Sequence, residues 1–179
     1  MDIVAVLGCG NSFRPLDSLR AKIMSLLPLF QWFQATRIGD TIRSSTYWFP
    51  AIEVVHLLGL VLLLGPVLVV DLRLLGFGMQ RQTTSRVAKA AAPLIRIGIA
   101  TMLLTGTLLF LAEAIKCYEN PAFWLKMYFL AGALAFHSTI YRWVTSSDSL
   151  NPFAKGITAI LSLTLWFGVA VGGRLIAFL

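Results

Sequence analysis

Charged side chains are scarce in this sequence: Asp, Glu, Lys and Arg make up only 13% of its 179 residues. A soluble domain carries about 25% charged residues, so this chain has too few to cover a surface that faces water. Hydrophobic residues make up 58%. This balance excludes an ordinary soluble enzyme, a disordered chain and a nucleic-acid-binding module. The length suits a single domain.

Cysteine and histidine are also scarce, with two of each. Cys9 and Cys117 form neither a disulfide framework nor a metal-ligand spacing. The sequence also lacks a glycine-rich phosphate loop, a pair of catalytic carboxylates and a Ser/His/Asp set. It therefore carries no motif that identifies an enzyme.

Long apolar runs are abundant instead. Four of them, at about 47–70, 94–115, 122–142 and 156–175, approach the roughly 20 residues that cross a bilayer as a helix. Short polar segments separate the runs, which favours neighbouring antiparallel helices. The sequence predicts an all-α, multi-pass integral membrane protein, with residues 24–179 forming a four-helix bundle in the lipid bilayer.

The segment before the first run mixes apolar and polar residues. Residues 25–43 are too short and too polar to span a bilayer, and we expect an N-terminal interfacial amphipathic helix there. The alternative is a soluble tail. Residues 1–23 form an N-terminal extension, and Met24 is an alternative start of translation, in which case the extension is not translated.

The net charge of +7 comes mostly from cations that flank the apolar runs. Such cations set topology and contact lipid headgroups, so no nucleic-acid partner is expected. Counted over the full chain, the two sides of the membrane are nearly balanced. For a chain that starts at Met24, the cations favour a cytoplasmic location for the first and third loops.

Small residues recur at helical spacing on two of the runs. Gly168 and Gly172 form one such face, and Ala131 and Ala135 form another. Small residues let membrane helices approach closely, either within the bundle or between two copies of the chain. Gly59 likewise indicates close helix packing or room for a flat ligand.

Both histidines, His56 and His137, lie within the predicted spans. A polar residue in a membrane is costly unless it is hydrogen-bonded or bound to something. Neutral imidazole is a common ligand of metals and haem iron. Either histidine is therefore a candidate cofactor or metal ligand; the alternatives are a hydrogen bond across the bundle and a proton relay.

Glu53 lies three residues before His56 and shares its helical face, so it could orient the imidazole ring. One Glu-x-x-His motif is not enough for a di-iron site, which needs two. If the spans alternate in direction, His56 and His137 lie in opposite halves of the bilayer. That offset weakens a model in which both histidines hold one haem.

Further charged residues lie at the ends of the predicted spans. For Asp71 we expect an ion pair with another helix end. Arg73, Arg142 and Arg174 are expected either in such pairs or on haem propionates and lipid phosphates, because guanidinium suits these oxyanions. Glu113 and Lys116 are one turn apart and are expected to pair.

Several strings carry a resemblance that covers about residues 24–179. They are Trp48-Phe49-Pro50-Ala51-Ile52-Glu53-Val54-Val55-His56-Leu57-Leu58-Gly59, Asp71-Leu72-Arg73-Leu74-Leu75-Gly76, Asn120-Pro121-Ala122-Phe123, Phe136-His137 with Tyr141-Arg142, and Gly173-Arg174-Leu175-Ile176-Ala177-Phe178. Together they resemble a family of small four-span bacterial inner-membrane proteins of uncharacterised function. The pattern is more loosely similar to membrane cytochrome b proteins and copper-resistance D-type proteins, although cytochrome b uses four histidines for two haems.

These observations give one leading functional hypothesis. The protein is expected to bind haem b, or less readily a metal, through His56 and/or His137, and to pass electrons between a quinone and a redox partner protein. The alternative is a non-catalytic structural or accessory membrane protein. Copper handling and small-solute permeation are weaker alternatives, because methionines such as Met102 and Met127 form no cluster.

Overall fold

The computed structural model describes residues 26–78, 81–147, 150–176 and 178, and no strand occurs among them. The predicted extension at residues 1–23 lies outside this part of the chain. The helices are α2 (Leu27–Gln34), α3 (Arg37–Ser44), α4 (Trp48–Leu74), α5 (Thr84–Ala112), α6 (Ala114–Glu119), α7 (Pro121–Phe136), the π-helical turn η1 (His137–Tyr141), α8 (Arg142–Ser146) and α9 (Pro152–Leu175).

Three of these helices, α4, α5 and α9, are long and apolar enough to cross a membrane. Their outward-facing side chains are apolar as well: Val61 is 69% exposed, Leu104 67% and Phe167 70%. In water such a surface would be unfavourable, whereas hydrocarbon tails cover it without cost. The chain is therefore a membrane protein with several apolar helices, as the sequence predicts.

The remaining predicted span, 122–142, corresponds to α7 followed by η1 and α8. The α-helix α7 has only 16 residues, because the hydrogen-bond pattern widens to that of a π-helix at His137. The chain nevertheless stays helical from Pro121 to Ser146. Single π-helical turns inside helices are often found at functional sites.

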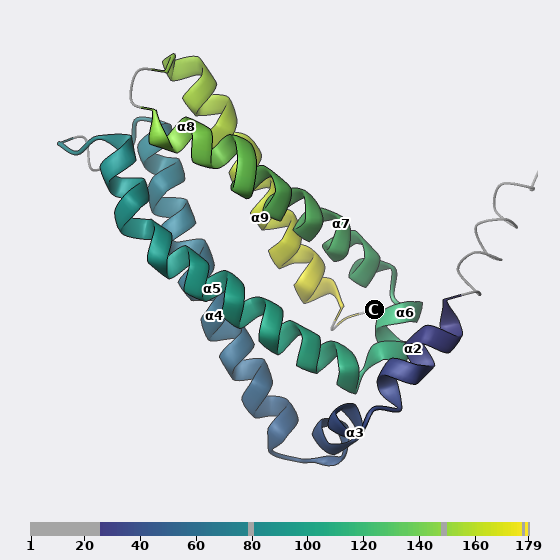
Figure 1. Ribbon diagram of the computed structural model, residues 1–179. Coiled ribbons are helices and arrows are strands. Elements are labelled where there is room, and N and C mark those ends of the chain that lie inside the picture. The colour runs from purple at the N-terminus through teal and green to yellow at the C-terminus, as the bar shows by residue number, and fades with distance from the viewer. Residues whose placement is uncertain (1–25, 79–80, 148–149, 177, 179) are drawn as a thin grey trace, which may run out of the picture.

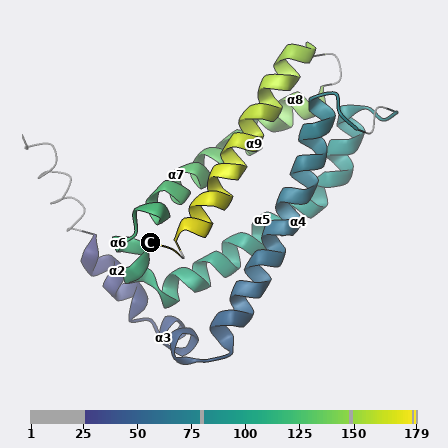
Figure 2. The ribbon, with the colours of Figure 1, turned by 180° about the vertical axis from the view of Figure 1, so that it is seen from behind.

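The long helices form two pairs that diverge (Figures 1 and 2). α4 packs along α5, α7 packs along α9, and α9 also contacts α4. The pairs meet at the end marked by α8 and separate toward the end that carries α2, α3 and α6. α4 and α7 run in the same direction, as expected for spans that alternate.

Helix α5 begins about ten residues before the predicted start of the second span. Thr83 caps it by accepting a hydrogen bond from the backbone N–H of Arg86, and Pro93 lies inside the helix instead of in its first turn. Val87 and Ala91 are buried in this early part. Packing on the neighbouring helix therefore extends α5 beyond the purely apolar run.

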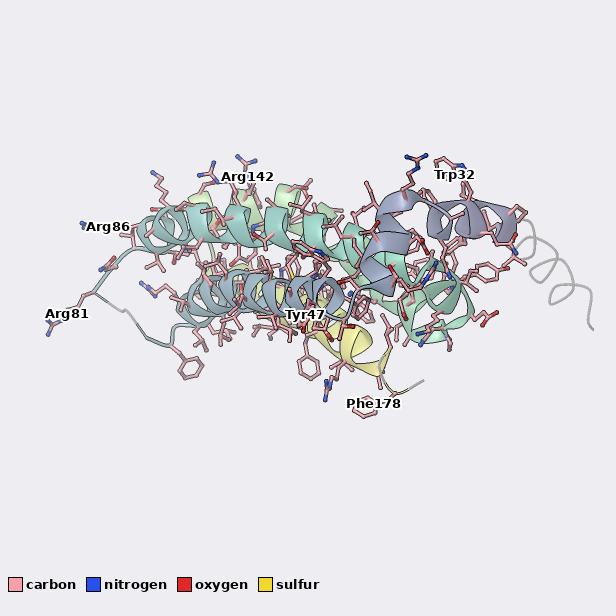
Figure 3. The ribbon with its side chains drawn as sticks, turned by 90° about the horizontal axis from the view of Figure 1, so that it is seen from below. Trp32, Tyr47, Arg81, Arg86, Arg142 and Phe178 are labelled. Carbon is pink, nitrogen blue, oxygen red and sulfur yellow. The ribbon has the colours of Figure 1, made fainter. Side chains whose placement is uncertain are left out.

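Two short helices replace the one amphipathic helix expected over residues 25–43. The chain turns at Thr36, whose hydroxyl donates to the carbonyl of Phe33 and accepts from the N–H of Gly39. Phe30 of α2 is buried and packs on Phe110 and Tyr118, with ring centroids 5.4 and 5.1 Å apart. The aromatic contacts thus fasten α2 to the ends of α5 and α6. Trp32 points away from these contacts, on the outer side of α2 (Figure 3).

Close contacts at glycine join the helices of each pair. A Cβ atom on Gly98 would lie 2.8 Å from backbone atoms of Leu63, and one on Gly59 would lie 2.8 Å from Thr101. Gly168 packs directly on the ring of Phe129. Gly59 and Gly168 therefore serve helix packing within the chain.

Candidate functional site

His56 is held by a hydrogen bond that joins α4 to α5. Its Nδ1 lies 2.7 Å from Thr105 Oγ1, and the Thr105 hydroxyl itself donates to the carbonyl of Thr101 at 2.6 Å. A threonine hydroxyl has only one proton to donate. Since that proton is used on Thr101, Nδ1 of His56 must be the donor to Thr105. The neutral ring therefore carries its proton on Nδ1 and leaves Nε2 as an unprotonated nitrogen.

Glu53, the residue expected to orient His56, lies exposed on the outer surface of α4. It makes no hydrogen bond or ion pair within the part of the chain that the structure describes. Thr105 takes the role of orienting the imidazole ring that was expected of Glu53. The threonine was missed because it lies 49 residues away in sequence.

His56 lines a cleft of about 230 Å³ between the two helix pairs. The walls are mostly apolar: Leu60 and Leu63 come from α4, Met102 and Phe110 from α5, and Trp166 from α9. Gly106 faces the imidazole, and a Cβ atom there would lie 3.3 Å from His56 Cε1. The cleft thus presents one imidazole to a mostly hydrophobic space.

Lys126 of α7 is the charged residue among those that line this cleft. Its side chain runs along Gly172 and Gly173 of α9, and its charge acts on His56. No salt bridge or hydrogen bond to its ammonium group is found among the described residues. Lys126 therefore places a cation beside the mostly apolar walls of the cleft.

His137 does not line the cleft. It lies in η1, where its ring stacks on Tyr141 with centroids 4.6 Å apart and meets Trp166 edge-on at 6.4 Å. Trp166 therefore contacts His137 and also lines the cleft that His56 faces. The structure does not bring the two histidines into one site, in line with their expected difference in depth.

The expected ion pair of Asp71 is wrong. Asp71 is completely buried, and its Oδ2 accepts a hydrogen bond of 2.7 Å from Ser162 of α9. The structure shows no salt bridge to Asp71 among the described residues. Asp71 precedes the helix end by one turn and faces α9, so it is enclosed by the bundle and cannot reach a cation at the surface. By contrast, the expected pair of Glu113 and Lys116 is confirmed at 2.7 Å.

The three arginines expected at haem propionates lie outside the cleft, at both ends of the molecule. Arg73 donates to the carbonyl of Gln82, and Arg142 points away from the helices (Figure 3). Arg174 lies at the other end, 5.0 Å from the ring of Phe178. Their positions suit headgroup contacts at two opposite interfaces.

No group of three or more His, Cys, Asp or Glu side chains that could hold a metal ion occurs within the described ranges. Burial raises the pKa of the Cys117 thiol in α6 to about 11. The thiol therefore stays protonated at neutral pH, where it is a poor metal ligand and a poor nucleophile. Among the described residues, the side chains left as candidate metal ligands are the two separate imidazoles, His56 and His137.

The comparisons with known proteins give a family without an activity. No curated protein and no solved structure shows significant similarity to the chain. One family, described as a family of unknown function (DUF6644), matches residues 29–179. This match begins close to the start of α2 and covers all the helices that form the cleft, so the chain belongs to this family of unknown function.

Proposed function

We propose that the protein is a four-span protein of the bacterial inner membrane that holds haem b in the cleft, with His56 as the iron ligand, and takes part in electron transfer. The observation that carries this proposal is the hydrogen bond between His56 Nδ1 and Thr105, which leaves Nε2 as a free donor atom. Histidines that bind metals commonly donate their other ring N–H in this way.

The fourth span in this proposal is the continuous helical stretch 121–146. At about 1.5 Å per residue it is about 39 Å long, which exceeds the roughly 30 Å of a bilayer core. With it, α4, α5, α7 and α9 alternate in direction across the membrane. The short helices α2, α3 and α6 then lie at one interface, where an amphipathic segment is stable.

The residues around the cleft would suit haem, because His56 would hold the iron and the apolar side chains would face the ring. Bound haem would supply one-electron redox chemistry, with a quinone or a redox partner protein as the exchange partner. Lys126 takes the role that the sequence suggested for the arginines, because its ammonium can pair with an anionic substituent such as a propionate. The cleft is smaller than the roughly 300–1,000 Å³ of typical ligand pockets, so a porphyrin would extend beyond it between the helix pairs.

The test is a reduced-minus-oxidised visible spectrum of the full-length protein, purified in mild detergent after expression with ample haem. We expect a b-type band that disappears in His56→Ala and persists in His137→Ala, which is the matched control. Protein without a band under these conditions would contradict the haem proposal. A band lost only in His137→Ala would show that His137, and not His56, is the iron ligand.

The second candidate function is that of an accessory membrane protein without a cofactor. The observation in its favour is the same hydrogen bond, because it joins α4 to α5 and gives His56 a structural role. In that case purified protein is colourless, and removal of the imidazole lowers the free energy of unfolding without any spectral change.

A further inference from the structure

A second group of polar side chains is enclosed where the two helix pairs meet. Asp71 comes from α4, Ser162 from α9, and Tyr141 and His137 from the π-helical turn η1. Asp71 and Ser162 are completely buried, and Tyr141 is 3% exposed. The group therefore draws on three separate helical segments; Asp71, Ser162 and Tyr141 are closed off from the surface, whereas His137 is partly exposed.

The carboxyl group of Asp71 is only half satisfied. Ser162 donates to Oδ2 at 2.7 Å, while Oδ1 is buried without a hydrogen-bond partner. A carboxylate buried without a cation loses its hydration and gains no ion pair in return. The neutral carboxylic acid is therefore the form that this enclosure favours.

The two residues from η1 are also incompletely paired. The Tyr141 hydroxyl faces the Asp71 carboxyl closely enough to interact with it, but both the hydroxyl and His137 Nδ1 are buried without a hydrogen-bond partner. The wide turn of η1 stacks the His137 ring on that of Tyr141. Folded proteins leave few buried polar atoms unpaired, and here the Asp71 carboxyl and the Tyr141 hydroxyl lie near enough for a small rotation to join them in a hydrogen bond.

We propose that Asp71, Tyr141 and His137 form an intramembrane proton-binding site in which Asp71 takes up and releases the proton. On release, the O–H bond of the Asp71 carboxyl breaks and the proton passes to a water molecule. The Ser162 hydroxyl, and the Tyr141 hydroxyl after a small rotation, donate to the carboxylate that remains. The site can thus accommodate both protonation states.

The charged groups around the site are compatible with this role. Arg142 acts on His137 from the adjoining position of α8, and Arg73, two residues after Asp71, is engaged with Gln82. On α9, Ser162 faces Asp71 and carries no charge. On α5, the buried polar residue near the end where the helix pairs meet is Thr84, which is also uncharged. Tyr141 is therefore the titratable group that faces Asp71, and His137 in turn faces Tyr141. The proposal does not depend on haem binding in the cleft.

Infrared spectroscopy of the full-length protein in detergent tests this site directly. A protonated carboxyl gives a C=O stretching band that a carboxylate lacks. We expect a band that Asp71→Asn removes and that disappears reversibly as the pH is raised from about 5 to about 10, a range that begins above the ordinary pKa of exposed carboxyl groups, about 3.9–4.3. Glu53→Gln, which changes an exposed carboxyl on the same helix, is the matched control and should retain the band.

Tyr141→Phe extends the test without removing the carboxyl, and it serves even if Asp71→Asn fails to fold. Loss of a donor to the carboxylate should move the midpoint of the titration to higher pH, whereas a merely structural tyrosine would leave it in place. A band that is absent at every pH, or unchanged across the range, would overturn the proposal. So would a band that Na⁺ removes at constant pH and ionic strength, since the site would then bind a metal cation.

Discussion

At the scale of single residues, the sequence identified the polar side chains within the apolar runs but not their partners on other helices. His56, His137 and Asp71 were singled out because polar groups are expensive in a membrane. The local spacing offered Glu53 as a partner for His56, yet the structure pairs His56 with Thr105, and Asp71 with Ser162, which lies 91 residues away. Such pairs depend on how each helix is rotated against its neighbour, which spacing along one helix does not determine.

The hydrogen bond at His56 gives a prediction for Thr105. Thr105→Val keeps the shape of the side chain but removes the acceptor of the His56 N–H. We expect the free energy of unfolding to fall by about 0.6 kcal/mol and by no more than about 1.7 kcal/mol, the mean and the maximum found for hydrogen bonds between membrane helices. The measurement is reversible unfolding of the purified protein in mixed micelles.

Thr107→Val is the matched control for this change. Thr107 lies on the same helix, and its hydroxyl donates to the carbonyl of Leu103 without bonding to a neighbouring helix. Its replacement should change the free energy of unfolding by less than about 0.5 kcal/mol. Equal losses in the two variants would show that the bond between His56 and Thr105 adds nothing to stability.

At the scale of helices, hydropathy predicted where the apolar segments lie but not how they begin or are interrupted. The run at 94–115 omitted the first turns of α5, because Arg86 and Lys89 make that stretch polar although Val87 and Ala91 are buried on its other side. The turn at His137–Tyr141 was not predicted either. Hydropathy does not distinguish a π-helical turn from an α-helical one, since the side chains are the same.

The close approach of α4 and α5 gives a prediction at this scale. A methyl group at Gly98 would meet backbone atoms of Leu63 at 2.8 Å, and a backbone cannot move aside as a flexible side chain can. We expect Gly98→Ala to lower the free energy of unfolding by about 1–3 kcal/mol, the usual cost of overpacking. Unfolding in mixed micelles again provides the measurement.

Gly156→Ala is the control for Gly98→Ala. Gly156 also lies inside a long helix, α9, but apart from its chain neighbours and its own helix backbone no atom lies within 4 Å of a Cβ placed there. Alanine is the better helix former by roughly 0.5–1 kcal/mol, so this variant should be unchanged or slightly more stable. If Gly98→Ala behaved in the same way, the contact between α4 and α5 at Leu63 would have to be looser than the structure shows.

At the scale of the whole molecule, the two groups of polar residues occupy different depths. The Asp71 group lies where the helix pairs meet, whereas His56 and Lys126 line the cleft between the pairs. Trp166 contacts His137 on one side and lines the cleft on the other. Trp166 therefore lies between the His137 ring and the cleft that His56 faces.

The four-span arrangement predicts which parts of the chain share a face of the membrane. In a background without Cys9 and Cys117, single cysteines replace exposed residues at the helix ends. If α7, η1 and α8 cross the bilayer together, Arg81→Cys and Ser146→Cys react with an impermeant thiol reagent from one side. Thr41→Cys and Glu119→Cys then react only from the other side. The cation distribution of a chain that starts at Met24 places Arg81 and Ser146 in the cytoplasm.

The variants Glu119→Cys and Ser146→Cys decide the number of spans. They mark the two ends of the helical stretch 121–146, whose crossing of the bilayer they test. Reaction of both from the same side of sealed spheroplasts would mean that this stretch does not cross, and that α4, α5 and α9 are the membrane helices. Arg81→Cys and Thr41→Cys provide the internal control, since α4 alone separates them and is long and apolar enough to span a bilayer. With three crossings, Asp71 and Tyr141 would not share a site enclosed within the membrane. The labelling pattern therefore bears on the proton site as well as on the topology.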